Sequence, residues 1–198
     1  MTIESVTYID DLNANYPEAN SNVSEGDDHI RNLKTAIKAT FPNVANPVDC
    51  IVQSVYVDSA AYQTGTVVLP LDNTTPQNTE GDEYETVTIT PKSATNKLII
   101  ECEALLTTTA SGNWMTMALF QDSTADALRA SAAYTPTANS GTWVTLRYEM
   151  TAGTTSSTTF KIRAGGNAAG TTGWGGAGGG LFNSNLGQFL KVTEVTSA

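Results

Sequence analysis

The chain has 198 residues and a formal net charge of −10, and only 15% of its residues are charged. This length provides for one domain of sandwich size and a smaller extension. The acidic balance argues against binding to nucleic acid or to anionic membranes, because a phosphate backbone is neutralised by Lys and Arg. No apolar stretch approaches the roughly 18 residues of a membrane-spanning helix, so no membrane insertion is expected.

The first segment, YIDDLNANYPEANSNVSEGDD, carries four Asn, one Pro and scattered acids, which indicates an extended segment ordered by a partner. The start of the chain, MTIESVTYIDDLN, lacks the positive and then apolar pattern of a signal peptide. We therefore expect synthesis and assembly in a host cytoplasm. The composition changes near residue 45, which predicts an N-terminal segment over 1–45 and a second domain over 46–198.

A helix is predicted over about 24–41, in SEGDDHIRNLKTAIKATF. Ser24 is the predicted N-cap, with Asp27 three residues later, and Pro42 ends the helix. Its apolar side chains recur at helical spacing, at Ile30, Leu33, Ile37 and Phe41. The segment has no core of its own. We therefore expect this stripe to pack on the same helix of sister chains or on another protein.

From about residue 50 onward the pattern predicts only short strands, separated by Gly, Pro, Asn and Ser. This spacing favours an antiparallel β-sandwich or jelly roll. The predicted strands are 51–57, 66–71, 85–90, 97–107, 113–121, 127–134, 142–150, 158–164 and 188–196. The chain is thus expected to be mainly β, with a short N-terminal extended segment and helix.

Strand 142–150 alternates cleanly, with apolar residues at every second position from Val144 to Met150. Strand 113–121 is apolar on both faces: Trp114, Ala118 and Phe120 lie on one, and Met115, Met117 and Leu119 on the other. An antiparallel strand normally leaves one face to solvent, so a loop of the chain or a neighbouring subunit should cover the outer face. Together with the unsupported helix, this pattern favours a symmetric oligomer.

Residues 165–180, GGNAAGTTGWGGAGGG, contain a GxGxxG match, but nine of the sixteen residues are Gly and no βαβ unit surrounds them. A dinucleotide site is therefore not expected. One alternative is an exposed loop that binds a host surface through Trp174, Asn167, Thr171, Thr172 and Asn183, a mixture of groups that suits sugars. The other alternative is close glycine packing at an oligomer axis, with Trp174 buried there.

No catalytic, cofactor or metal site is predicted. Glu101 and Glu103 share a strand face at a separation that glycoside hydrolysis could use, but such pairs usually belong to a solvated surface. His29 is the only histidine and lies in the predicted helix. Cys50 and Cys102 are too few for a disulfide framework or a zinc site, and Cys102 lies on an apolar strand face as a buried thiol.

Two parts of the sequence resemble phage tail proteins. The stretch YIDDLNANYP…SEGDDHIRNLKTAIKATFPNV is similar to the start of many tail-fibre and tail-appendage proteins. The stretches TPQNTEGDEYETVTITPKSATNKLIIECEA, MALFQDSTADAL and FLKVTEV resemble the β-rich C-terminal modules of the same group. The resemblance covers about residues 7–44 and 76–196.

The resemblance implies a structural virion protein of the tail, a homotrimer whose N-terminal part docks to tail or baseplate proteins. It implies a β domain that points outward toward a host cell-surface glycan or protein, and it brings no catalytic residues. Two roles remain open: host-surface recognition, or a purely structural fibre, collar or decoration part that contacts only virion proteins.

Overall fold

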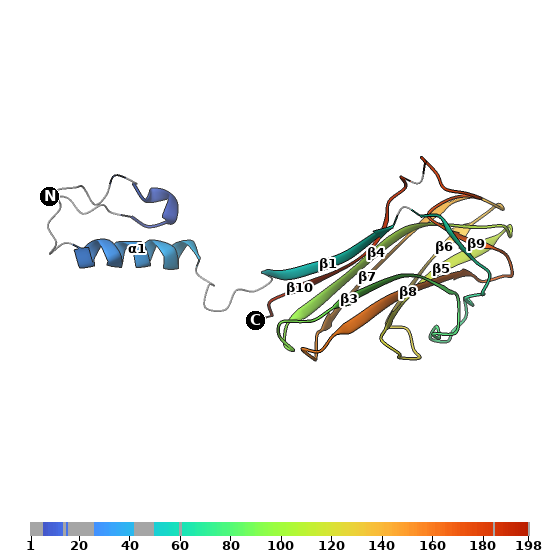
Figure 1. Cartoon of the computed structure of the whole chain (residues 1–198), viewed down its shortest axis with the longest axis horizontal. Coiled ribbons are helices and arrows are strands. Elements are labelled where there is room, and N and C mark those ends of the chain that lie inside the picture. Colours follow the sequence, from blue (N-terminus) through green and yellow to red (C-terminus); the bar gives the residue numbers. More distant parts are fainter. Residues whose placement is uncertain are drawn as a thin grey trace. The chain divides into compact units, whose positions relative to one another are not determined.

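The computed structural model describes residues 6–13, 15, 26–41, 50–59, 61–183 and 185–197 (Figure 1). The chain divides into two compact units. One comprises Met1–Val48 with Ala198, and the other comprises Asp49–Ser197.

The N-terminal unit contains a short 3-10 helix, η1 (Ile9–Asp11), and the predicted α-helix, α1 (Gly26–Thr40). The Asp11 carboxylate accepts hydrogen bonds from the backbone N–H groups of Thr7 and Tyr8, at 3.0 and 2.9 Å. The Ile9 N–H donates to the Thr40 hydroxyl at 2.7 Å, which joins η1 to the end of α1. The predicted N-cap Ser24 and helix-ending Pro42 lie outside the described residues.

The second unit is an antiparallel β-sandwich, as predicted (Figure 1). Its strands are β1 (Ile51–Ser59), β2 (Gln63–Gly65), β3 (Asp82–Ile89), β4 (Lys97–Thr108), β5 (Asn113–Gln121), β6 (Arg129–Thr135), β7 (Thr142–Thr151), β8 (Thr158–Gly166), β9 (Thr172–Trp174) and β10 (Gln188–Val195).

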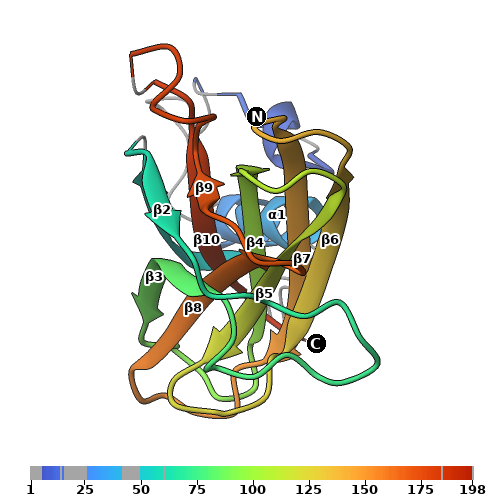
Figure 2. The ribbon, with the colours of Figure 1, turned by 90° about the vertical axis from the view of Figure 1, so that its right-hand side faces the viewer.

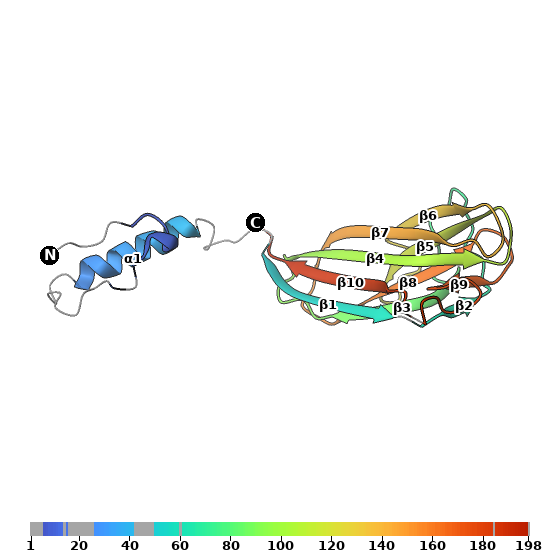
Figure 3. The same ribbon diagram turned by 90° about the horizontal axis from the view of Figure 1, so that it is seen from above.

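The two sheets have the connectivity of a jelly roll. One sheet runs β1-β10-β4, and β4 then pairs with β7 along most of its length and with β9 near its end, where β2 follows. The other sheet runs β3-β8-β5-β6. With the two three-residue strands set aside, each sheet has four long strands, and consecutive strands repeatedly cross between sheets. Figure 3 shows β1, β10, β4 and β7 side by side across one layer.

The core lies between the sheets and consists of the inward residues that alternation assigns. On β4 these are Leu98, Ile100, Cys102, Ala104 and Leu106, all buried. They face Met115, Met117 and Leu119 of β5 and Phe160 and Ile162 of β8. The prediction that the Cys102 thiol is buried is confirmed, and burial raises its pKa far above the ordinary value. Cys50 is exposed.

The predicted strand 66–71 is wrong. Residues 66–76 form an irregular segment, which we call the strap, that crosses the outer face of β8, β5 and β6 (Figure 2). The Leu69 N–H donates to the Gly166 carbonyl at 3.0 Å, and the Gly81 N–H donates to the Val68 carbonyl at 3.0 Å. TVVLPL is apolar because it covers a sheet, and Pro70 is poorly suited to a central strand.

The strap accounts for the two apolar faces of β5. Leu69, Ala118 and Phe120 form a second buried cluster outside the sandwich core, with Ala127 packed against it. Of the two covers considered for this face, a loop of the same chain is the one observed at Ala118 and Phe120. This face therefore gives no reason by itself to require a neighbouring subunit.

Candidate functional site

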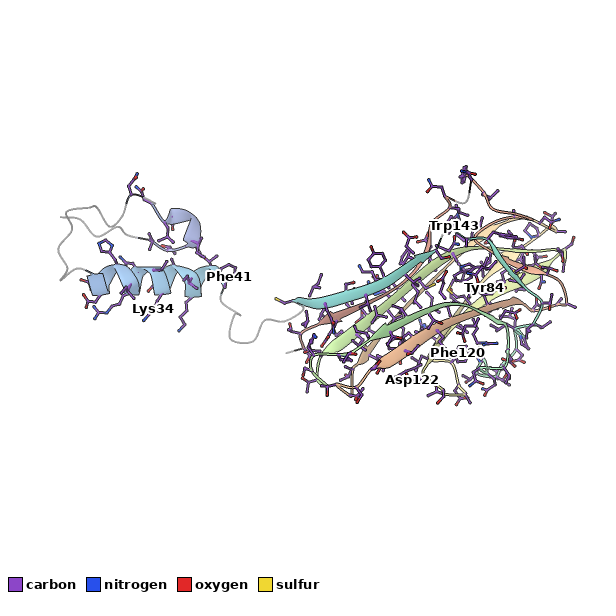
Figure 4. All side chains as sticks on the ribbon, in the orientation of Figure 1. Lys34, Phe41, Tyr84, Phe120, Asp122 and Trp143 are labelled. Carbon is purple, nitrogen blue, oxygen red and sulfur yellow. The ribbon has the colours of Figure 1, made fainter. Side chains whose placement is uncertain are left out.

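The apolar stripe of α1 is exposed within the described residues. Ile30, Leu33, Ile37 and Phe41 are 54%, 44%, 40% and 50% exposed, while Ala36 is fully buried. Figure 4 shows Phe41 and Lys34 projecting from this helix. Arg31 forms ion pairs with Asp27 and Asp28 at 2.9 and 2.8 Å, which hold charge on the first turns of the helix. The stripe is thus an apolar surface on an otherwise polar helix.

The structure does not place Trp174 on an exposed tip. Its indole is fully buried within its own chain and stacks on Tyr84, with ring centroids 5.0 Å apart and an interplanar angle of 6°. A buried ring offers no face to a ligand, so the interpretation of Trp174 as an exposed contact is wrong. Packing against sister loops is not needed to bury it either, because β2 and β4 flank β9 on both sides.

The other residues of the predicted loop are dispersed. Asn167 is exposed at the end of β8, and its side-chain Oδ1 accepts the Trp114 N–H at 2.8 Å. Thr172 is buried in β9, and the Thr171 N–H donates to the Thr109 hydroxyl at 2.9 Å. Asn183 is exposed, with a positive φ of 59°, in the connection before β10. These side chains therefore do not form one site.

The glycines of this run permit close packing over the interior. A Cβ on Gly175 would overlap the Gln188 side chain, and Gly175 also has a φ of +75°. A Cβ on Gly173 or Gly176 would press on the Tyr62 ring, at 2.9 and 2.6 Å. At these positions only glycine fits, because a Cβ would collide with neighbouring side chains. Packing therefore accounts for the GxGxxG match, and no nucleotide is needed to explain it.

Beneath this cover lies a buried polar cluster, created by a bulge in β3. The register of β3 with β8 shifts between Glu83 and Glu85, so Tyr84 and Glu85 are both buried although they are consecutive. Within this cluster, four buried polar atoms lack a hydrogen-bond partner among the described residues: Tyr84 Oη, Glu85 Oε1, Trp174 Nε1 and Gln188 Oε1. Figure 4 shows Tyr84 directed into the sandwich.

Burial raises the pKa of Glu85, although the Trp174 and Ser59 side chains, which approach the carboxyl, oppose this shift. The carboxyl is thus biased toward its neutral form. Burial also raises the pKa of Tyr84, so its phenol stays protonated. The cluster is enclosed by the Gly-rich cover and packs as part of the domain interior.

The carboxylates weighed as a catalytic pair lie on the outer face of the larger sheet. Glu101 accepts from Arg147 at 3.5 Å, and Arg147 also pairs with Glu149 at 2.7 Å. Lys97 lies 3.8 Å from Glu149 in the same row of charges. Glu103 is also on this face, opposite Thr145. This arrangement is a surface network of ion pairs.

A feature that the sequence did not single out is an exposed aromatic pair on the smaller sheet. Trp114 and Tyr134 are cross-strand neighbours on β5 and β6, with ring centroids 5.4 Å apart and an interplanar angle of 55°. Both are accessible, at 41% and 49%. The alternation of β5 assigns Trp114 to a strand face in the sequence. Its pairing with Tyr134 depends on the register of β5 with β6, which the sequence does not show.

Among the described residues, no group of three or more His, Cys, Asp or Glu side chains is arranged to hold a metal ion. In the same part of the chain, the helices are too short and polar to cross a membrane.

No protein-family model matches this chain, and neither does any curated protein. Solved structures do show similarity. The Eiger TNF of S. frugiperda has 7% identity and a TM-score of 0.43, over 73% of this chain and 94% of its own. The xylan-binding CBM22-1 domain of Paenibacillus barcinonensis Xyn10C has 11% identity and a TM-score of 0.35, over 77% and 99%.

The infectious bursal disease virus VP2 subviral particle has 12% identity and a TM-score of 0.35, over 75% of this chain and 40% of its own. At these identities and scores the similarity carries no argument about what this chain binds. The class that the strand order itself defines is an antiparallel jelly-roll domain preceded by a helical unit.

Proposed function

We propose that this chain is a structural component of a phage tail, of the tail-fibre or tail-appendage kind. Its N-terminal unit docks to tail or baseplate proteins, and its β domain is displayed toward the host surface. The role involves no catalysis and no cofactor. The observation that carries this proposal is the exposed apolar stripe of α1 in a unit separate from the β domain.

The energetics of the stripe support a docking role. Burying one large apolar side chain is worth roughly 1.5–3 kcal/mol. Four such side chains, spaced along one helix face, therefore suit a groove on a partner protein. The resemblance of residues 7–44 to the start of tail-fibre proteins supports a virion partner.

The assembly we propose is a homotrimer. The exposed stripe of α1 supports an oligomer, because three copies of the helix can pack their stripes against one another and also contact the tail. The trimeric number comes from the tail-fibre resemblance.

Leu33→Asp tests docking, because it places a charge in the centre of the stripe and leaves the sequence of the β domain unchanged. We expect mutant protein to be absent from assembled virions while its β domain melts as the unmodified domain does. Thr35→Asp is the matched control, since Thr35 is exposed and lies on the opposite side of α1 from the stripe. Normal copy number of Leu33→Asp protein in virions would refute docking through α1.

Host recognition is tested separately from docking. Fluorescently labelled full chain should adhere to susceptible host cells and not to resistant ones. Adhesion to neither, with normal incorporation into virions, would favour the purely structural role.

A further inference from the structure

A groove of about 170 Å³ lies between the strap and the outer face of β5 and β6. Its walls are Pro70, Leu71 and Pro76 on one side and Ala130 and Ala132 on the other. The short side chains of these two alanines leave space between the sheet and the strap, and this space is the groove. Asp72, Thr74 and Thr116 contribute carboxylate and hydroxyl groups to the lining, whereas the side chain of Ser131, which alternates with Ala130 and Ala132, lies on the other face of β6.

The Trp114–Tyr134 pair stands next to this groove on the same sheet face. Trp114 precedes Thr116 by two residues on β5, and Tyr134 follows Ala132 by two on β6. Residues two apart on a strand share a face and lie about 7 Å apart. The groove and the aromatic pair are therefore one continuous surface, with polar groups in the channel and two exposed rings beside it.

The floor of the groove contains an unmet hydrogen-bonding group. Thr116 is only 3% exposed, and its hydroxyl has no hydrogen-bond partner among the described residues. A buried hydroxyl without a hydrogen-bond partner costs free energy. A ligand hydroxyl that bonds to it therefore gains more binding free energy than a ligand hydroxyl that only displaces a water molecule from a protein group. Rotation about χ1 exchanges the Oγ1 and the methyl group and can turn this hydroxyl toward the channel.

We propose that this groove and the adjoining aromatic pair bind a neutral saccharide. The rings take the C–H face of a sugar unit, and Thr116 and Asp72 hydrogen-bond its hydroxyl groups. The proposal deepens the host-surface role proposed above and names the class of ligand for it.

The lining favours a neutral sugar over other ligands. The described residues that line the groove include no Lys or Arg, and the one charged side chain among them, Asp72, is negative in a chain of net charge −10. Phosphates and acidic sugars are therefore disfavoured. The volume is below the roughly 300–1,000 Å³ of pockets that enclose drug-sized molecules. One sugar unit in the channel with a second on the rings fits this size better than an enclosed ligand does.

The test uses the purified full chain and methyl glycosides of glucose, galactose, mannose and N-acetylglucosamine, with glucuronate as the charged comparison. Saturation-transfer NMR and calorimetry report binding. We expect at least one neutral glycoside to bind and glucuronate to bind more weakly. Failure of all four neutral glycosides, or preferential binding of glucuronate, would overturn the proposal.

Three substitutions locate the site. Trp114→Ala and Tyr134→Ala should each weaken binding about tenfold or more, and Thr116→Val, which keeps the shape, should weaken it several-fold. Trp143→Ala is the control, because Trp143 is a similarly exposed indole on the other sheet, at 46%. An equal loss in Trp143→Ala would place the site elsewhere.

The proposal can fail independently of virion docking, because glycoside titration needs no virion. If Trp114→Ala changes the mass of the oligomer in solution and leaves glycoside binding intact, the pair is a contact between copies and the saccharide site is refuted. If glycosides bind but Leu33→Asp is still incorporated into virions, only the docking proposal fails.

Discussion

Replacing the buried indole of Trp174 by alanine should destabilise the β domain strongly. Trp174 is fully buried in the sandwich and its ring lies nearly parallel to that of Tyr84. Removing a buried Trp typically costs about 3–5 kcal/mol, and a stacked aromatic partner adds roughly 0.5–1.5 kcal/mol.

For a domain of this size each kcal/mol lowers the melting temperature by about 2–4 °C. Trp174→Ala should therefore melt roughly 6–20 °C below the unmodified chain. Circular dichroism at several heating rates measures this shift. Trp143→Ala is the matched control, because its indole is exposed on the outer face of β7 (Figure 4), and it should melt within a few degrees of the unmodified chain.

The result that would refute this reasoning is a melting temperature for Trp174→Ala equal to that of Trp143→Ala. Such a result would mean that the indole is not part of the folded interior. Loss of host adhesion at unchanged melting temperature would revive the exposed-tip interpretation of Trp174.

Glu85→Gln should raise the melting temperature above that of the unmodified chain, and the increase should be larger at pH 7 than at pH 4. The raised pKa of Glu85 makes its charged form destabilising as pH rises above about 4.5. Equal increases at both pH values would contradict this. Glu194 is the opposite case: burial raises its pKa, but hydrogen bonds from Asn96, Gln53 and the Lys92 and Ser93 N–H groups outweigh this and lower it. Glu194→Gln should therefore cost roughly 1–3 kcal/mol at pH 7, measured by denaturant unfolding, and less as pH falls below 4.5. Light scattering on the purified chain at micromolar concentration should give the mass of a trimer, and a monomer mass would rule the trimer out.

The fold could be predicted from the sequence because most strands of the sandwich have one face exposed to solvent, which makes apolar and polar residues alternate. Alternation in WVTLRYEM assigned Val144 and Leu146 to the interior, where they are buried. Helical spacing likewise located α1, since no tertiary contact is needed to see a period of 3–4 residues. These are local signals that neighbouring residues carry.

The candidate site could not be predicted from the sequence in the same way. TVVLPL has the composition of a strand, and only the position of Leu69 over Ala118 and Phe120 shows it to be a cover. The bulge at Tyr84 breaks the alternation of EYETVTI by one residue, so that Tyr84 is buried beside Glu85, and the sequence contains no mark of it. Trp174 was placed on a loop because glycine runs are commonly exposed. Its burial depends on Tyr84, which is 90 residues away along the chain.

The antiparallel pairing of β1 with β10 has a mechanical consequence. Ile51 pairs with Val195, and the Thr196 N–H donates to the Cys50 carbonyl at 3.0 Å, so the chain enters and leaves the β domain at one end. Force applied between these two ends would unzip the ladder one hydrogen bond at a time. Force applied between residue 50 and the connections at the opposite end, such as 109–112, runs along the strands and loads all the hydrogen bonds of a ladder in shear. A domain anchored before residue 50 and gripped at its far end would therefore resist tension in its stronger direction.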